Sequence, residues 1–368
     1  MIDEDKYLTA FASVPDIGPA RLRLLRDFFG NAGKAWLASE EELEKTGLPK
    51  KVLLQFLSRR NNLDVSKYER DVRERGIKYL TINNRTYPER LKNIPDPPNV
   101  IFLKSNLTIE QFSNLTMSKI IAVVGTRKMT SYGKEVTEAL VQGLVDAGFT
   151  IVSGMALGID GVAHGTALNS KGVTIAVLGA GVDIIYPREH RDLYHKIIES
   201  GGAIVSEVAP EKMVGRGIFP ARNRIISGLS EAVLVTEGAM DSGSLITARS
   251  ALEQGREVFA VPGPINSQMH EGVNYLLKQG AKLVTSVKDI VEELGYESSL
   301  SVQSKQELPR GDTPDEQKII DLLIQEPLDF DELVRRTGMS SKKLGSLLAT
   351  MEVEGKLKSA NLIYRLFS

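Results

Sequence analysis

Short apolar runs rich in β-branched residues alternate with helix-length amphipathic stretches between residues 76 and 295 of this chain. The runs are KIIAVVG, FTIVSG, VTIAVLGAG, GAIVSE, AVLVTEG and EVFAVPG. Near-continuous apolar strands separated by helices are typical of a mostly parallel sheet that is covered on both faces. Because crossovers between parallel strands are right-handed, the pattern predicts a doubly wound α/β domain.

The N-terminal flank, residues 1–75, shows helical spacing and no strand pattern. Pro15 and Gly18 precede a set of apolar positions at helical intervals, and a second Gly-Leu-Pro turn precedes KKVLLQFL. We expect a helical domain of the helix-hairpin-helix or SAM-like kind. Such a domain could bind a DNA backbone or contact another protein, and the sequence does not decide between these two functions.

The C-terminal flank begins with a polar segment without periodicity, residues 296–314, which we interpret as a linker. Residues 315–368 then give three helical patterns and a terminal hairpin, the plan of a winged helix. Residues 314–368 carry nine acidic and eight basic side chains, whereas modules that read a DNA groove have a basic excess. We therefore favour a protein-contact role, which Lys342 and Lys343 could overturn.

Composition narrows the class of protein. The 368 residues include no cysteine, which excludes disulfides, thiolate metal sites and cysteine nucleophiles. The chain starts without a signal-peptide pattern and has no apolar run long enough for a membrane span, so we expect a cytoplasmic protein without membrane contact. The net charge of −1 means that any nucleic-acid site must gather its cations locally.

Small and hydroxylated residues follow the predicted strands at one edge of the sheet. Backbone amides can approach an anion closely at such turns, and helix N-termini add favourable potential. We predict a phosphate-binding cleft there, formed by Gly125, Thr126, Ser153, Gly154, Gly179, Gly181, Ser242, Gly243 and Ser244. Four cations are expected beside it: Arg127, Arg188, Arg222 and Arg224. For the last two, pairing with a carboxylate of the sheet is the alternative to phosphate contact.

Several chemistries are disfavoured by missing motifs. The sequence has neither a G-x-x-x-x-G-K-[ST] phosphate loop nor a G-x-G-x-x-G after the first core strand. His190 and His195 lack the spacing that puts two metal ligands on one helix face. We expect no metal, no cofactor and no catalytic residue. Asp160 and His164 are interpreted as a structural pair. Glu237 could act as a general acid or base, which keeps a nucleotide-binding or nucleotide-hydrolysing enzyme as the alternative.

The motifs along the core resemble those of the DprA/Smf family of DNA-processing proteins. They are G-T-R-x-x-T at 125–130, S-G-M-A-L-G-I-D at 153–160, T-I-A-V-L-G-A-G-V-D-I-I-Y-P at 174–187, F-P-A-R-N-R-I-I-S-G-L-S at 219–230, S-G-S-L-I-T-A at 242–248 and G-R-E-V-F-A-V-P-G at 255–263. The resemblance implies an extended Rossmann-like fold that binds single-stranded DNA and is not an enzyme. It also implies a homodimer that protects incoming DNA in natural transformation and loads the RecA recombinase onto strands coated by single-strand-binding protein.

The resemblance also implies roles for individual residues. Arg127 matches the arginine of the family's DNA-binding motif, and Arg188 matches a second cation in the Tyr-Pro loop. Sequence-tolerant binding of single strands combines a positive groove with aromatic platforms for the bases. Phe219 is the first candidate for base stacking, ahead of Tyr186 and Tyr132. Sequence-dependent duplex binding through the winged helix is a third possible function.

Overall fold

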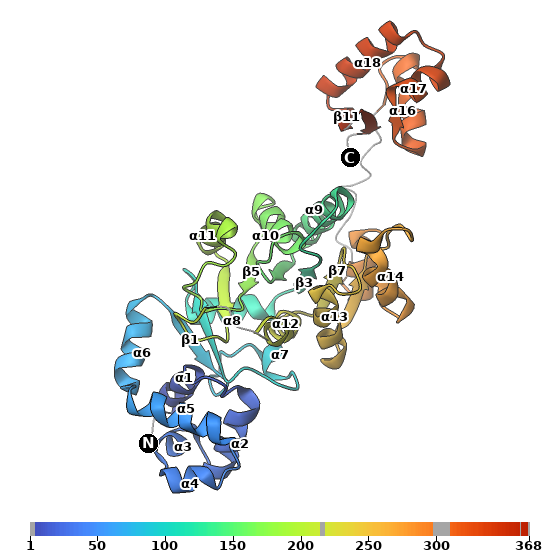
Figure 1. Ribbon diagram of the computed structural model, residues 1–368. Coiled ribbons are helices and arrows are strands. Elements are labelled where there is room, and N and C mark those ends of the chain that lie inside the picture. The colour runs from blue at the N-terminus through green and yellow to red at the C-terminus, as the bar shows by residue number, and fades with distance from the viewer. Residues whose placement is uncertain (1–3, 214–217, 297–309, 361, 367–368) are drawn as a thin grey trace. The chain divides into compact units, whose positions relative to one another are not determined.

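The computed structural model describes residues 4–213, 218–296, 310–360 and 362–366, apart from the side chains of residues 218, 219 and 360. The chain forms two compact units, residues 1–298 and 299–368 (Figure 1). The finer boundaries expected from the sequence, including the linker at 296–314, stay predictions, and most of that segment lies outside the described residues. Among the described helices, none has both the length and the apolar character that crossing a membrane requires.

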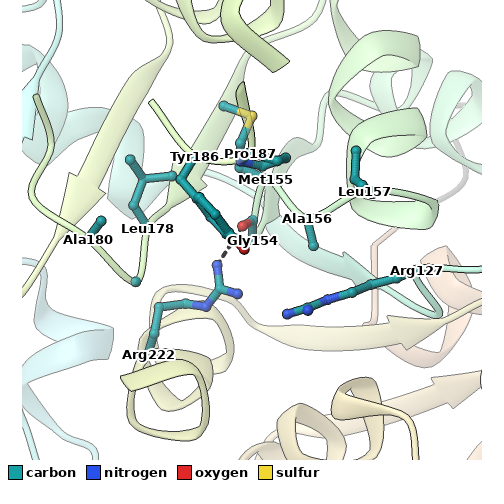
Figure 2. Close-up of a pocket in the computed structure, with 11 residues that line it drawn as sticks. Arg127, Gly154, Met155, Ala156, Leu157, Leu178, Ala180, Tyr186, Pro187 and Arg222 are labelled. Atoms are coloured by element: carbon teal, nitrogen blue, oxygen red, sulfur yellow. Dashed lines mark hydrogen bonds between the residues drawn. The ribbon is translucent and has the colours of Figure 1, made fainter. Parts of the chain in front are cut away.

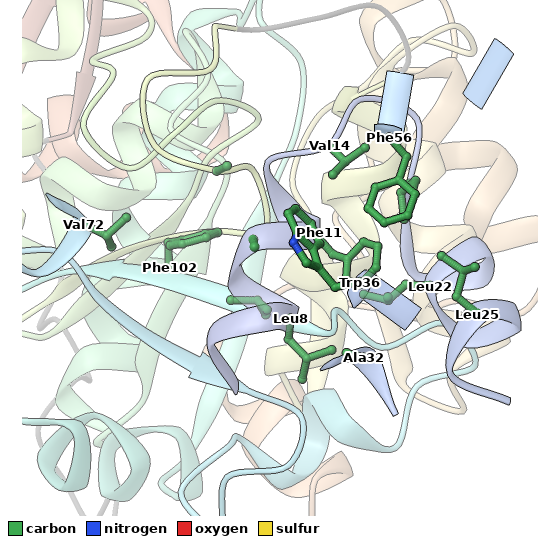
Figure 3. Packing of buried hydrophobic residues seen from close by; sticks show 14 of the residues in the cluster. Leu8, Phe11, Val14, Leu22, Leu25, Ala32, Trp36, Phe56, Val72 and Phe102 are labelled. Carbon is green, nitrogen blue, oxygen red and sulfur yellow. The ribbon is translucent and has the colours of Figure 1, made fainter. Parts of the chain in front are cut away.

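The first unit begins with short helices that pack around aromatic side chains. The helices are α1 (Glu4–Ala12), α2 (Pro19–Phe29), α3 (Ala32–Leu37), α4 (Glu40–Glu44), α5 (Lys50–Asn61) and α6 (Val65–Glu74). The ring of Trp36 lies 4.9 Å from that of Phe11 and 5.3 Å from that of Phe56 (Figure 3). Phe102 of the sheet belongs to the same buried cluster, so the helices are anchored on the sheet.

The sheet has nine strands within the described residues. They are β1 (Lys78–Thr81), β2 (Val100–Lys104), β3 (Ile120–Val124), β4 (Thr150–Ser153), β5 (Thr174–Val177), β6 (Ala203–Ser206), β7 (Ala232–Val235), β8 (Glu257–Ala260) and β9 (Lys282–Leu283). The order is β1-β2-β6-β5-β4-β3-β7-β8-β9, and all pairs from β6 to β9 are parallel. The predicted mostly parallel sheet is confirmed. The antiparallel pairs β1–β2 and β2–β6 extend it at one edge.

Helices cover both faces of this sheet. They are α7 (Glu89–Lys92), α8 (Ile109–Met117), α9 (Ser131–Asp146), α10 (Ile159–Asn169), α11 (Arg191–Glu199), α12 (Ile218–Leu229), α13 (Gly243–Glu253), α14 (Glu271–Lys278) and α15 (Val287–Glu293), with 3-10 turns η1 (Arg188–His190) and η2 (Gln268–His270). Alternate side chains of β3 show the two layers. Ile120 packs in the cluster with α12 and α13, and Ile121 packs in the cluster with α9 and α10.

The strand order places a topological switch point in the middle of the sheet. The chain runs from β3 outward through β4, β5 and β6, and then returns to add β7 on the other side of β3. In doubly wound folds, ligands bind outside the carboxyl ends of the strands around such a point. The loops after β3, β4, β5 and β7 therefore form the part of this unit where a site is expected.

The second unit is a winged helix, as predicted. It contains α16 (Pro314–Gln325), β10 (Leu328–Asp329), α17 (Phe330–Thr337), α18 (Ser341–Val353), β11 (Leu357–Ala360) and β12 (Ile363–Leu366). The strands form an antiparallel sheet of order β10-β12-β11. Buried Ile319, Leu333 and Leu348 from its three helices form a core within the unit.

Candidate nucleic-acid interface

A pocket of about 60 Å³ lies at the carboxyl ends of the central strands (Figure 2). The loops after β3, β4 and β5, the Tyr-Pro loop and the helix α12 contribute to it. Its lining residues are Arg127, Gly154, Met155, Ala156, Leu157, Leu178, Gly179, Ala180, Tyr186, Pro187 and Arg222. Two guanidinium groups thus face a lining that is otherwise mainly apolar, with one aromatic ring.

Arg222 is the buried cation of this pocket. Its Nη1 donates to the carbonyl oxygens of Gly154 at 2.6 Å and of Val177 at 2.5 Å, which ties α12 to the ends of β4 and β5. Burial lowers the pKa of Arg222 to about 10, although the carboxylate of Asp160 acts in the opposite direction. Burial raises the pKa of Asp160, and the charge of Arg222 opposes that shift. The two charges therefore compensate each other inside the protein.

Asp160 organises the loop that follows β4. Its Oδ2 accepts hydrogen bonds from the amides of Gly154 at 3.1 Å and Ala156 at 3.4 Å. Gly154 has to be a glycine, because a Cβ there would lie 2.4 Å from the Nη1 of Arg222 and 2.7 Å from the Oδ2 of Asp160. The predicted hydrogen-bonded pair of Asp160 and His164 is wrong. Asp160 accepts the two amides instead, and the Nδ1 of His164 is hydrogen-bonded to the Oγ1 of Thr174 at 2.6 Å.

Most donors of the predicted phosphate cleft are engaged inside the protein. The amide of Thr126 donates to the carbonyl of Glu237, that of Gly181 to the carbonyl of Lys212, and that of Ser244 to the hydroxyl of Ser242. The Oγ of Ser153 donates to the carbonyl of Val123 at 2.6 Å. These groups hold the turns together. Their predicted contacts with DNA, like those of Gly125 and Gly243, stay predictions.

The structure separates the four predicted cations. Arg127 is exposed and its guanidinium points across the pocket toward Arg222 (Figure 2). Arg188 is exposed and directly follows Pro187 of the lining. Arg224 bonds to both carboxylate oxygens of Glu207 at 2.9 Å, which is the pairing that the sequence offered as the alternative.

The aromatic candidates also differ in position. Tyr186 lines the pocket, and the residue is 45% exposed. Tyr132 is not among the lining residues; its hydroxyl donates to the carbonyl of Pro262 at 2.8 Å. The side chain of Phe219 lies outside the described residues. Of the two candidates whose side chains the structure describes, Tyr186 is the one that lines the pocket together with Arg127.

The remaining lining residues were not singled out from the sequence. Met155, Leu157 and Leu178 belong to motifs quoted above, but none of them was proposed as a site residue. Asp160 had one usable signal, since it follows a glycine-rich turn in the first turn of a helix, where a carboxylate can accept amide hydrogen bonds. Its pairing with an arginine 62 positions away could not be inferred from local pattern.

Sequence comparison agrees with this architecture. The profile of the family described as DNA recombination-mediator protein A matches residues 78–295, more than half of the chain. The chain belongs to this family, DprA. The profile of the DprA winged helix domain matches residues 303–360, which identifies the second unit as well.

Named relatives fall in the DprA/Smf group. Protein Smf of Synechocystis is 37% identical over 84% of this chain and 77% of its own length. DNA processing protein DprA of Bacillus subtilis is 46% identical over 60% of this chain and 73% of its own length. The X-ray structure of DprA from Streptococcus pneumoniae superposes with a TM-score of 0.68 at 33% identity, over 81% of this chain and 100% of that one.

A second solved structure carries information about a ligand. DprA from Helicobacter pylori, whose structure is described as giving insight into a unique single-stranded DNA binding mode, superposes with a TM-score of 0.52 at 30% identity. The match covers 59% of this chain and 95% of that one. The family predicted from the motifs is confirmed, and the chain is a member of a family of DNA-processing proteins.

Proposed function

We propose that this chain is a sequence-independent single-stranded-DNA-binding protein that acts in the cytoplasm as a homodimer. In this role it protects incoming DNA during natural transformation and loads the RecA recombinase onto strands coated by single-strand-binding protein. Membership in the DprA family and the single-stranded DNA bound by the Helicobacter pylori relative support the proposal.

The observation that carries the proposal is the pairing of cations with an aromatic ring at one pocket. Arg127 is exposed at its rim, Arg188 follows its Tyr-Pro loop, and Tyr186 offers a ring face. Single-stranded nucleic acid is bound without sequence preference by this combination, in which cations track the phosphates and rings stack on the bases. Because the lining is mainly apolar, we assign it to a base and the two exposed arginines to flanking phosphates.

The other predicted contacts complete the proposed path of the strand. Gly154, Gly179 and Arg222 belong to the lining itself, and Phe219 is retained as a second stacking candidate. Contacts beyond the lining are proposed for Gly125, Thr126, Ser153, Gly181, Arg224, Ser242, Gly243 and Ser244. Of these, Arg224 is the weakest candidate, because its charge is already paired with Glu207.

Arg127→Ala is expected to weaken the binding of fluorescent oligo-dT by about 10- to 100-fold, since a lost charge-assisted contact is worth roughly 1.5–3 kcal/mol. The slope of log K against log salt should also fall by about 0.7, the value for one phosphate contact on a single strand. The measurement is a titration at several salt concentrations, run beside a matched duplex.

The matched control is Lys128→Ala, because Lys128 is an exposed cation of the same loop that does not line the pocket. Equal losses of affinity for oligo-dT in the two variants would mean that binding depends only on the total positive charge of the loop and not on the position of Arg127. If oligo-dT does not bind to the wild-type chain even at low salt, the single-strand proposal is wrong.

Tyr186→Ala is expected to lower affinity for oligo-dT by about 1–3 kcal/mol, the usual effect of removing one ring from a stacked base. Tyr186→Phe should retain most of the affinity, because the ring face remains. Both variants are measured by the same titration. An unchanged affinity of the alanine variant would remove Tyr186 from the interface.

For the winged helix we propose a protein-contact role. Lys343 at the start of α18 forms an ion pair with Asp315, which engages one of the two lysines that could have favoured a DNA groove. The recombinase and the single-strand-binding protein are the partners that the family role implies.

The alternative of a nucleotide-processing enzyme depended on Glu237 as general acid or base. Its side chain is fully buried and accepts two hydrogen bonds from Thr130. A proton-transfer group must come within hydrogen-bond reach of its substrate. The burial of Glu237 therefore supports a binding protein rather than an enzyme.

A further inference from the structure

The switch point between β3 and β7 holds a second feature, separate from the pocket described above. The helix α9 begins there with Thr130 as its N-cap, directly beyond the end of β3. In doubly wound folds a phosphate group of the ligand is bound at this helix N-terminus, where amides and the helix dipole favour negative charge. The residue that occupies the position in this chain is Glu237, two residues after β7.

The carboxylate of Glu237 is held as a bound anion would be. Its Oε2 accepts the amide of Thr130 at 2.9 Å, and its Oε1 accepts the hydroxyl of Thr130 at 2.7 Å. The same hydroxyl accepts the amide of Gly133 in the first turn of α9. The carboxylate lies directly against Gly133, because a Cβ there would lie 2.1 Å from the Oε2 of Glu237.

His270 supplies an independent observation on the opposite side of the carboxylate. This side chain is 3% exposed, and within the described residues its Nε2 has no hydrogen-bond partner. The Nε2 lies 3.6 Å from the Oε1 of Glu237, and the Nδ1 lies 2.9 Å from the Oγ of Ser267. A Ser267 hydroxyl that donates to Nδ1 leaves the ring proton on Nε2, directed at the carboxylate. A buried donor aimed at this point, yet too distant to bond, fits a site built for a larger oxyanion.

We propose that α9 and His270 form an oxyanion site that the chain fills with its own Glu237 carboxylate. Glu237 stands in for the phosphate of a ligand and keeps the phosphate of a mononucleotide from this position. The doubly wound domain thus keeps the architecture of a nucleotide-binding fold, while the anion position at the N-terminus of α9 is occupied by a side chain of the protein itself. This inference does not depend on single-stranded DNA binding at the Arg127 pocket.

Chemical rescue tests the proposal in the full-length chain. Glu237→Ala deletes a fragment that corresponds to acetate, so acetate can refill the vacated position. In chloride we expect the thermal midpoint of this variant to fall by about 5 °C or more. Replacing about 50 mM chloride by acetate at constant ionic strength should restore at least half of that loss, since a ligand that binds only the folded state raises its stability.

Two controls separate a specific site from a general salt effect. The wild-type chain has the position filled, and Glu237→Leu fills it with an apolar side chain of similar size, so neither should gain stability from acetate. A gain in Glu237→Ala no larger than in these two overturns the proposal. If Glu237→Ala does not fold in chloride, its refolding yield in acetate against chloride decides instead, and no gain there overturns it. Oligo-dT binding by the wild-type chain is measured separately, so failure of one proposal is not failure of the other.

Discussion

Arg222→Ala is expected to lower the free energy of unfolding of the first unit by about 3–5 kcal/mol, the cost of leaving a buried charge without the opposite charge that compensates it. The substitution leaves the buried carboxylate of Asp160 without its cation, and the carbonyls of Gly154 and Val177 lose their donor. Because these contacts tie α12 to two strand ends, binding of oligo-dT should fail together with folding.

Urea unfolding followed by tryptophan fluorescence measures this effect. Trp36 is the single tryptophan of the chain, and it is buried in the cluster that joins the N-terminal helices to the sheet. The double variant Arg222→Met with Asp160→Asn should lose less stability than the sum of its two single variants, because it leaves no unpaired charge.

The matched control for this prediction is Arg127→Ala. It removes an arginine from the same pocket, but an exposed one, so the free energy of unfolding should change by no more than about 0.5 kcal/mol. Equal destabilisation by Arg127→Ala and Arg222→Ala would contradict the distinction between an arginine that anchors the fold and one that we propose to contact DNA.

A loss of stability in acid is the second large effect that we expect. His164 is fully buried, and burial, together with the nearby His190 and Arg222, lowers its pKa from 6.5 to about 3. Between these two values the unfolded chain binds a proton that the folded chain does not. Stability is therefore complete above about pH 6.5 and falls as the pH drops toward 3, by on the order of 4 kcal/mol from this residue.

Urea midpoints measured at intervals from pH 7 to pH 4 test this assignment. His164→Gln should lower stability at neutral pH, since it disturbs the bond to Thr174, but its stability should change less with pH than that of the wild-type chain. His195→Gln, at an exposed position, should keep the wild-type pH dependence. The same pH dependence in His164→Gln and the wild-type chain would show that other groups cause the acid loss.

The parallel core of the fold could be predicted from local pattern alone. A strand buried on both faces has to be apolar at nearly every position, so β3 to β8 stand out in the sequence. The antiparallel edge was not anticipated, because β1 and β2 carry too little pattern to reveal their pairing direction. The winged helix was also predictable from local pattern, since its three helices each carry an apolar stripe.

The candidate site was predictable as a location but not as a set of contacts. Parallel strands bring their carboxyl ends to one edge, so Gly154, Gly179 and Arg127 could be expected together. Whether an amide at that edge is available to a ligand depends on distant side chains. The amide of Gly154 donates to the carboxylate of Asp160, and no rule of sequence spacing predicts this hydrogen bond.

The sequence by itself determined the family, the fold class and the strand edge at which the site lies, because these follow from periodicity and from motifs that are local in the chain. Only the tertiary structure decided whether each arginine near the site forms contacts inside the protein or is exposed. Arg222 and Arg224 are two residues apart on α12, yet one enters the sheet ends and the other pairs with Glu207. Whether a charged side chain forms a contact inside the protein depends on distances in three dimensions. Residues far apart in the sequence provide its partners and bury it, and they thereby decide whether it stabilises the core or is available to a ligand.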